Sequence, residues 1–361
     1  MPSIDYAKAR ELLDTLFIEA EAALFRKSPL KVESHFADAC ESVFGSGTQA
    51  YREVLLGCTV ARTQDPSIDV RRPYVEQGPN AFSGRSLDEK VVNPFLQRNR
   101  IPCSRGPYLS VFRRSIKFDS STRSGLRDKV AYDSLLEALV YLQDRKVDEL
   151  LGPLGFQLYK FAELRETADI PLARVQRISL DQYDKLIGML LTTPSGGLFP
   201  VLLVVATFRA IKAFFKAQWE ITWQGINVSD AASGAGGDVT ISNPEGILLA
   251  VEVTERTVDK SRVVTTFNSK IAVNNIGDYL FVVGPSGYSA EAKAQAQRYF
   301  AQGHEVNFVD IEDWIIVSLA TMGTEGRAIF NAELMGILDG QGLRRALRVS
   351  WNNHISDLLA T

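Results

Sequence analysis

Two carboxylates in the C-terminal half have residue types and positions suited to metal chemistry. Asp238 follows a glycine run and opens an expected strand, whereas Glu252 lies inside the otherwise apolar segment LLAVEVT. A buried carboxylate is costly unless something pairs with it. Two carboxylates that converge repel each other unless a divalent cation joins them. Magnesium suits such a pair because it takes oxygen ligands and keeps several waters, and a bound metal can activate water and stabilise a phosphoryl group.

The elements around these carboxylates predict a mixed α/β sheet with helices on its faces. Asn243-Pro244-Glu245-Gly246 is typical of a turn, so the strands on either side form a hairpin that brings Asp238 and Glu252 to one end of the sheet. The expected order is a helix from 199 to about 218, strands 219–227, 238–242 and 247–255, a helix 261–275, a strand 278–284, a helix 289–303, a strand 305–311, and a mainly helical remainder.

The N-terminal half differs in character, because apolar residues recur there at helical spacing. Helices are expected over 4–26, 32–44, 48–61, 130–147, 155–167 and 180–192, with a Pro/Gly-rich irregular stretch over 65–107 and a strand over 108–118. We therefore expect a mainly helical region, 1–195, and a second region, 196–361, that contains the sheet and a helical C-terminal extension.

Plainer interpretations exist for each carboxylate alone. A single Asp after glycine is usually a turn residue, and a single Glu in a strand often faces solvent or pairs with a lysine. Together, in this order of elements, Asp238 and Glu252 favour a metal site.

The stretch Phe199–Ile311 resembles the common core of PD-(D/E)XK nucleases. In that family an Asp opens the second strand and a (D/E)-x-K triplet lies on the third. Asp238 and Glu252 match the two acidic positions, and Gly237 replaces the motif proline. The resemblance implies Mg²⁺ bound by both carboxylates and by the backbone carbonyl of Val253.

Thr254 stands where this family usually has lysine, and its hydroxyl can only form hydrogen bonds. The motif lysine is thought to position the attacking water and to offset charge in the transition state. Lys270 on the following helix is our first candidate for the missing cation, and Lys260 is the second. The alternative is that both lysines are ordinary solvated surface residues.

A second resemblance concerns residues 50–120 and the segment TPSGGLFPVLL. The run FSGRSLDEKVVNPFLQ…RIPCSRGPYLSVFRRS is similar to restriction endonucleases of the SacI type. This resemblance implies a type II restriction endonuclease that works as a homodimer and cuts double-stranded DNA at a short palindrome.

Positive charge is concentrated between Arg98 and Lys129, where nine basic and two acidic residues give a net +7 in a chain of net −3. Arginine binds phosphates with two parallel hydrogen bonds and recognises guanine in the major groove. The segment from about 65 to 129 is therefore the expected DNA-recognition region, with a merely solvated basic face as the alternative. The candidate DNA-contacting residues are Arg85, Arg98, Arg100, Arg105, Arg113, Arg114, Lys117, Arg123 and Arg127.

A second basic row, Arg209, Lys212 and Lys216, lies at helical spacing on the long apolar helix. Its side chains either contact phosphate near the metal site or form the solvent-facing side of the helix, which is the commoner case.

Several function classes are not favoured by the sequence. The sequence contains no GxxxxGK[ST] motif, which would indicate an ATP-driven motor. The glycines of SGAGGD precede an expected strand, whereas a nucleotide-binding loop needs a helix after its glycines. The apolar run Leu198–Phe208 predicts a buried helix rather than a membrane span. The N-terminus lacks the pattern of a secretory signal, and Cys40, Cys58 and Cys103 lack zinc-ligand spacing. We expect a cytoplasmic protein with buried thiols, without ATP or a membrane.

Two alternatives to a restriction enzyme stay open. The same nuclease core occurs in repair or junction-processing nucleases and in nuclease subunits of defence complexes. A DNA-binding protein with a decayed nuclease core would also explain Thr254, although the presence of both Asp238 and Glu252 argues against that alternative.

Overall fold

The computed structural model describes residues 2–112, 117–223, 237–340 and 342–360. The chain forms two compact units, Met1–Ile170 and Pro171–Thr361. The division falls before the expected boundary at residue 195, because α8 (Leu180–Thr192) packs on α12 (Ile311–Asp339) and α13 (Arg345–Ala360) in the second unit. The apolar stripe of α8 therefore belongs to the second hydrophobic core.

The described residues of the first unit form helices and irregular connections but no strand. Helix α3 is its central element, since every residue from Ala50 to Ala61 is buried, including Arg52 and Glu53. Helices α2, α4, α6 and α7 pack on α3, and the described part of the long connection between α3 and α6 contains short helices and irregular segments. The helices are α1 (Tyr6–Phe25), α2 (Ser34–Gly45), α3 (Ala50–Gln64), α4 (Gly84–Leu87), α5 (Asn93–Arg98), α6 (Lys129–Gln143) and α7 (Leu151–Arg165).

The prediction of a strand over 108–118 is wrong for the described residues of that segment. Tyr108–Phe112 forms a 3₁₀ helix, and residues 113–116 lie outside the described part of the chain. The aromatic residues suggested a strand, but Tyr108 and Phe112 are buried at a helical spacing against the core. The Tyr108 N–H donates to Asp88 at 2.9 Å and its hydroxyl to the Gly84 carbonyl at 2.9 Å. Asp88 thus satisfies the backbone N–H that a strand would pair with a neighbour, and Gly84 satisfies the buried hydroxyl.

The second unit contains one five-stranded mixed sheet in the order β1-β2-β3-β4-β5. The first three strands are antiparallel, and β3, β4 and β5 are parallel. The parallel pairs need crossover connections, which α10 and α11 provide. The strands are β1 (Glu220–Trp223), β2 (Val239–Asn243), β3 (Gly246–Thr254), β4 (Asp278–Val283) and β5 (Glu305–Asp310).

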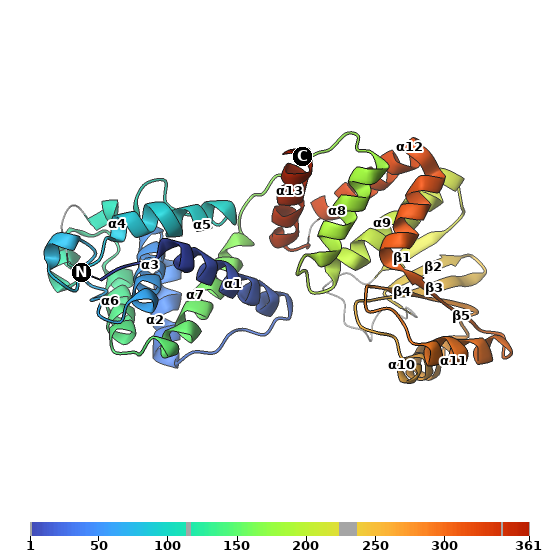
Figure 1. Ribbon diagram of the computed structural model, residues 1–361, viewed down its shortest axis with the longest axis horizontal. Helices are drawn as coiled ribbons and strands as arrows, with labels where there is room; N and C mark the ends of the chain where they lie inside the picture. Colours follow the sequence, from blue (N-terminus) through green and yellow to red (C-terminus); the bar gives the residue numbers. More distant parts are fainter. Residues whose placement is uncertain (1, 113–116, 224–236, 341, 361) are drawn as a thin grey trace. The chain divides into compact units, whose positions relative to one another are not determined.

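Helices cover both faces of this sheet, as Figure 1 shows. Helices α10 (Lys260–Thr266) and α11 (Ala290–Phe300) lie on one face, and α9 (Leu198–Phe215) and α12 lie on the other. Residues from β3, β4, α10 and α11 form one buried cluster that includes Ala250, Phe281 and Ala296. The expected order of helices and strands from residue 199 is confirmed, and so is the fold class.

Helix α9 is long and apolar enough to cross a membrane by length and composition alone. In this protein it packs against α12 and β3, and most residues from Phe199 to Ala210 are buried. Pro200 lies in its first turn, where a missing N–H costs no intrahelical bond. The expected buried helix is therefore present.

The expected hairpin between β2 and β3 is also present, and its turn has a clear local cause. The Asn243 side-chain oxygen accepts hydrogen bonds from the N–H groups of Glu245 and Gly246 at 2.9 and 3.1 Å. Gly246 has a φ of 142°, which residues with a Cβ rarely adopt. The turn pairs Asn243 with Gly246, and a β-bulge between Ile241 and Ser242 then shifts the register by one residue, so that Val239 pairs with Val251.

Candidate active site

The β2–β3 hairpin brings Asp238 and Glu252 to the same end of the sheet. Asp238 directly precedes β2, and its Oδ2 accepts a hydrogen bond of 2.7 Å from the Val253 N–H. Glu252 is adjacent to Val253 in β3, and its side chain is only 9% exposed. We call Asp238 and Glu252 the carboxylate pair.

Four donors meet the two oxygens of Glu252. Nε and Nη2 of Arg262 donate to Oε1 at 3.1 and 2.7 Å. Nζ of Lys270 and the hydroxyl of Tyr279 donate to Oε2 at 3.1 and 2.8 Å. A carboxylate offers about four lone-pair positions, so these donors account for the whole capacity of Glu252.

The helix that follows β3 presents both cations through an irregularity in its winding. After α10 the chain continues into a wide π turn, Phe267–Ile271. In a regular α-helix Arg262 and Lys270 would lie about 80° apart around the axis. Because a π turn takes up one extra residue, the interval between them spans about two full turns. Both side chains therefore reach Glu252 from one face.

Tyr279 comes from β4 and approaches Glu252 from inside the sheet layer. It pairs with Ala250 in the parallel register, so its side chain points to the same face as those of Ala250 and Glu252. Tyr279 is 1% exposed, and its ring lies 5.2 Å from that of Phe281. Burial, and then the charge of Glu252, raise the pKa of the Tyr279 hydroxyl well above its ordinary value.

The two carboxylates differ in their tendency to ionise. Burial raises the pKa of Asp238, the Val253 N–H lowers it, and the nearby charge of Glu252 raises it again, with a net upward shift. Burial also acts to raise the pKa of Glu252, but Lys270, Arg262 and Tyr279 outweigh burial and the net shift is downward. Glu252 is thus held as an anion, whereas Asp238 makes no ion pair with any described residue, and the charges of Lys270 and Arg262 lower its pKa less than burial raises it.

Thr254 and Lys260 do not supply a cation to the carboxylate pair. The Thr254 hydroxyl accepts a hydrogen bond of 3.1 Å from the Arg256 N–H, so it stabilises the turn after β3. Lys260 is an exposed residue at the start of α10, and it is not among the described donors to Glu252. Of the two candidate lysines, the structure brings Lys270 to the carboxylate pair.

Sequence reasoning missed Arg262 and Tyr279. The signal for Tyr279 was its position in the strand expected next to β3. Arg262 carried no signal, because its approach to Glu252 follows from the docking of α10 on the sheet. The pairing of Glu252 with Lys270 also fits the plainer interpretation of a structural ion pair.

The oxygen atoms at the carboxylate pair are of the kind that binds a small divalent cation, although donors from this chain occupy both oxygens of Glu252. In a strand the N–H and C=O of one residue point to the same neighbour. The Val253 carbonyl therefore faces the Asp238 side, beyond the end of β2, as its N–H does. No group of three or more His, Cys, Asp or Glu side chains gathers among the described residues. Two carboxylates and a carbonyl suit magnesium, which keeps several waters.

Comparison with known families covers both units of the chain. A family model for the SacI restriction endonuclease N-terminal domain matches residues 8–159, and one for the C-terminal domain matches residues 177–285. The chain belongs to the SacI restriction endonuclease family. A search of curated proteins found no match. Family membership makes this protein a restriction endonuclease, and hence a nuclease that binds double-stranded DNA.

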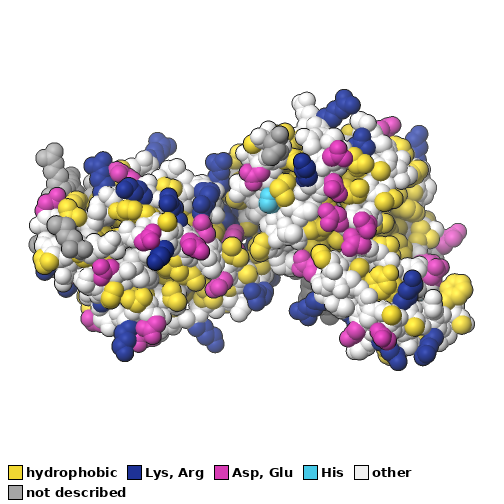
Figure 2. All heavy atoms as spheres, viewed as in Figure 1, with side chains coloured by type: hydrophobic (Ala, Val, Ile, Leu, Met, Phe, Trp, Pro, Cys, Tyr) yellow, Lys and Arg dark blue, Asp and Glu magenta, His cyan; other side chains and the backbone are white. Residues whose placement is uncertain are grey.

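The arginines expected to contact DNA fall into different environments in the endonuclease. Basic and acidic side chains are interspersed on the visible face of each unit (Figure 2), and three of the expected DNA contacts already bind carboxylates. The pairs are Arg85 with Glu89, Arg98 with Asp14 and Arg123 with Asp133. Arg100 is exposed and Lys117 is half-buried. Arg113 and Arg114 lie outside the described residues.

Arg105 and Arg127 are brought together at one cavity in the first unit. The cavity has a volume of about 470 Å³ and is also lined by Thr48, Gln49 and Ala50, where α3 begins. Both arginines are exposed. Two cations beside the N-terminus of a helix make this cavity a favourable place for a DNA phosphate.

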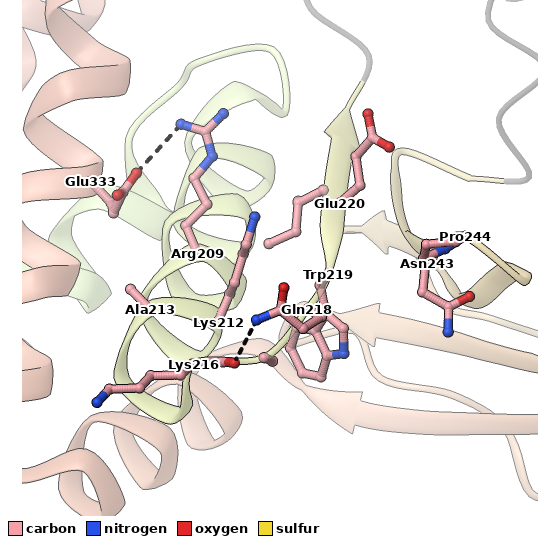
Figure 3. Close-up of a pocket in the computed structure, with 12 residues that line it drawn as sticks. Arg209, Lys212, Ala213, Lys216, Gln218, Trp219, Glu220, Asn243, Pro244 and Glu333 are labelled. Carbon is pink, nitrogen blue, oxygen red and sulfur yellow. Dashed lines mark hydrogen bonds and ion pairs between the residues drawn. The ribbon is translucent and has the colours of Figure 1, made fainter.

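The second basic row lies away from the carboxylate pair. Arg209, Lys212 and Lys216 line a hollow of about 900 Å³ together with Asn243 at the hairpin turn (Figure 3). Asn243 and Asp238 stand at opposite ends of β2, roughly 17 Å apart at the usual rise per residue. The close-up shows Arg209 directed at Glu333, to which it is joined at 3.5 Å. These cations therefore do not serve the carboxylate pair.

Gly237 allows the approach that positions Asp238. A Cβ at this residue would lie 2.5 Å from the Val251 carbonyl oxygen. Gly237→Ala should therefore displace Asp238 from the Val253 N–H and destabilise the protein by about 1–3 kcal/mol, with slower DNA cleavage. Thermal unfolding and a cleavage assay test this prediction. Gly277→Ala is the matched control, because a Cβ there meets nothing within 4 Å; equal behaviour of both variants would contradict the prediction.

Proposed function

We propose that this protein is a type II restriction endonuclease that hydrolyses both strands of DNA at a short palindrome with Mg²⁺ as cofactor. The observation that carries the proposal is the convergence of Asp238 and Glu252 at one end of the sheet. Membership of the family along both units supports it. The order of one helix, a three-stranded meander, a helix and a strand agrees with the resemblance to PD-(D/E)XK nucleases.

In the proposed mechanism Asp238, Glu252 and the Val253 carbonyl hold the cation. When bound, Mg²⁺ would activate a water and offset charge on the phosphoryl group. Tyr279 fixes the orientation of Glu252 from the interior. Lys270 is 40% exposed and close to Glu252, so its ammonium group can reach a phosphate beside the pair. Lys270 would take the role of the motif lysine, because Thr254 occupies the motif position in this sequence.

The first test is a plasmid digest with and without Mg²⁺, with wild-type protein and two isosteric variants. Asp238→Asn and Glu252→Gln should each lower cleavage by several orders of magnitude, because each removes a charged ligand for the cation. Binding to cognate DNA should persist, since many phosphate contacts stay. Wild-type protein that binds DNA but never cuts it would favour a non-catalytic DNA-binding protein, the alternative that Thr254 keeps open.

Removal of the Lys270 ammonium should slow the chemical step. A donor that stabilises transition-state charge is typically worth a factor of roughly one hundred or more. Lys270→Ala should therefore reduce the single-turnover cleavage rate by about that factor. Lys260→Ala, on the same helix but away from Glu252, is the control and should cut at the wild-type rate. If Lys270→Ala also cuts at the wild-type rate, another group supplies the positive charge at the scissile phosphate.

We infer that Arg105 and Arg127 bind a DNA phosphate at the cavity that they share in the first unit. Removal of either guanidinium should weaken binding and make it less sensitive to salt, because one fewer counterion is released. Arg105→Ala and Arg127→Ala should thus lower DNA affinity several-fold in a salt titration followed by fluorescence anisotropy. Arg123→Ala is the comparison, since Asp133 already binds that guanidinium. A larger decrease for Arg123→Ala would refute this assignment.

We also propose that the endonuclease is a homodimer. A palindrome has two-fold symmetry, and two copies of the chain would place one carboxylate pair at each strand. Light scattering should give the mass of a dimer with cognate DNA bound. A monomer in both the free and the bound state would instead favour a repair or junction nuclease.

A further inference from the structure

Arg262 occupies the atoms that the proposed cation needs. Its guanidinium donates twice to Oε1 of Glu252, while Lys270 and Tyr279 share Oε2. Since about four lone-pair positions are available on a carboxylate, a metal ion that coordinates Glu252 has to displace at least one donor.

The three donors differ in how easily they can leave. Tyr279 is 1% exposed, and its hydroxyl would become a buried donor without a partner, which is costly. Departure of Lys270 would free only one of the two lone-pair positions on Oε2, because Tyr279 also donates to that oxygen. Departure of Arg262 frees the whole of Oε1, and its side chain is 30% exposed. A divalent cation also repels the guanidinium, so Arg262 is the donor that yields.

A cavity at the end of β3, one residue along the chain from Glu252, can receive the displaced guanidinium. It has a volume of about 260 Å³, and Arg262 already forms part of its lining. The end of β3 contributes Val253 and Thr254, and the turn after it contributes Glu255 and Arg256. At about 30 Å³ per water in the liquid, the space holds several waters or a phosphate group. Two arginines against one glutamate give its wall a net positive charge.

We propose that Arg262 has two positions: it binds Glu252 in the metal-free protein and turns into this cavity to bind a DNA phosphate when a divalent cation occupies the carboxylate pair. The inference rests on the proposed function and assigns the cavity to a phosphate beside the scissile bond. Arg256, which lines the same cavity, binds the same phosphate. The guanidinium fork suits this role, because it makes two parallel hydrogen bonds to phosphate oxygens.

This exchange links the binding of metal and of DNA. The cation releases Arg262 to the phosphate, and the phosphate draws Arg262 away from Glu252. Each ligand therefore increases the affinity for the other by the same factor, as linkage requires. The metal-free protein keeps Glu252 fully paired, so the buried charge is compensated before DNA arrives.

Magnesium binding to the DNA-free protein tests the proposal without reliance on activity. Isothermal titration calorimetry should show about tenfold tighter Mg²⁺ binding by Arg262→Gln than by wild type, because a competing charge-assisted pair is absent. Arg256→Gln removes the same charge from the same cavity but no bond to Glu252, so its Mg²⁺ affinity should change by less than about twofold. Arg262→Lys keeps the charge without the fork and should lie between Arg262→Gln and wild type.

The effect on DNA has the opposite sign. At saturating Mg²⁺ and limiting DNA, Arg262→Gln should cleave about tenfold more slowly than wild type although it binds the metal more tightly, because a phosphate contact is missing. Circular dichroism checks that each variant is folded. If Arg262→Gln binds Mg²⁺ no more tightly than Arg256→Gln does, the proposal is wrong.

A further variant separates this inference from the proposed function. Asp238→Asn should lose Mg²⁺ binding if the metal site is assigned correctly. Loss in Asp238→Asn with no gain in Arg262→Gln overturns only the two-position role of Arg262. Wild-type Mg²⁺ affinity in Asp238→Asn overturns the metal site itself, and the inference about Arg262 with it.

Discussion

The negative charge of Glu252, buried between the sheet and the helices that follow it, is the constraint on which the second unit depends. An isolated carboxylate in such a place is strongly unfavourable. It is tolerated here because a guanidinium, an ammonium and a phenol each donate to it. The π turn after α10 and the parallel register of β4 are needed to deliver these donors. Local winding and strand pairing are thus both tied to one charge.

The carboxylate pair is asymmetric as a result. Glu252 forms ion pairs with two cations, whereas Asp238 accepts a backbone N–H, is repelled by Glu252 and is stabilised only weakly by Lys270 and Arg262. An additional positive charge between the two would relieve the repulsion and stabilise ionised Asp238. The proposed divalent cation would therefore be favoured at the Asp238 side, although each donor to Glu252 would oppose its full coordination. Competition between the cation and these donors would couple the affinity for metal to the binding of DNA.

The first unit differs from the second in that its positive charge lies on a helical framework. Its basic segment carries a large local excess of arginine, but several of these side chains bind carboxylates of the same unit. Formal charge in a segment therefore overstates the cations available to DNA. Arg105 and Arg127 differ because the irregular connection between α3 and α6 places them at one cavity.

The sequence alone determined the helix and strand order of the second unit, because period-2 and period-3.6 apolar patterns are local properties of the chain. It also placed Asp238 and Glu252 on neighbouring strands, since a turn at Asn243–Gly246 leaves a hairpin as the simplest connection. Lys270 was singled out in a different way, from the resemblance to nucleases in which a key residue has moved to the helix after the third strand. The strand order and the hairpin depend on short segments whose geometry is set by nearby residues.

Only the tertiary structure decided the rest. Arg262 and Tyr279 reach Glu252 from a docked helix and a parallel strand, and no local pattern encodes the angle of docking or the strand register. The aromatic segment at Tyr108 became a 3₁₀ helix because the buried Asp88 and the Gly84 carbonyl supplied partners from elsewhere in the chain. The type of a side chain determines which bonds it can make. Its actual partner depends on packing between segments far apart in sequence, because an unpaired charge is too costly to bury.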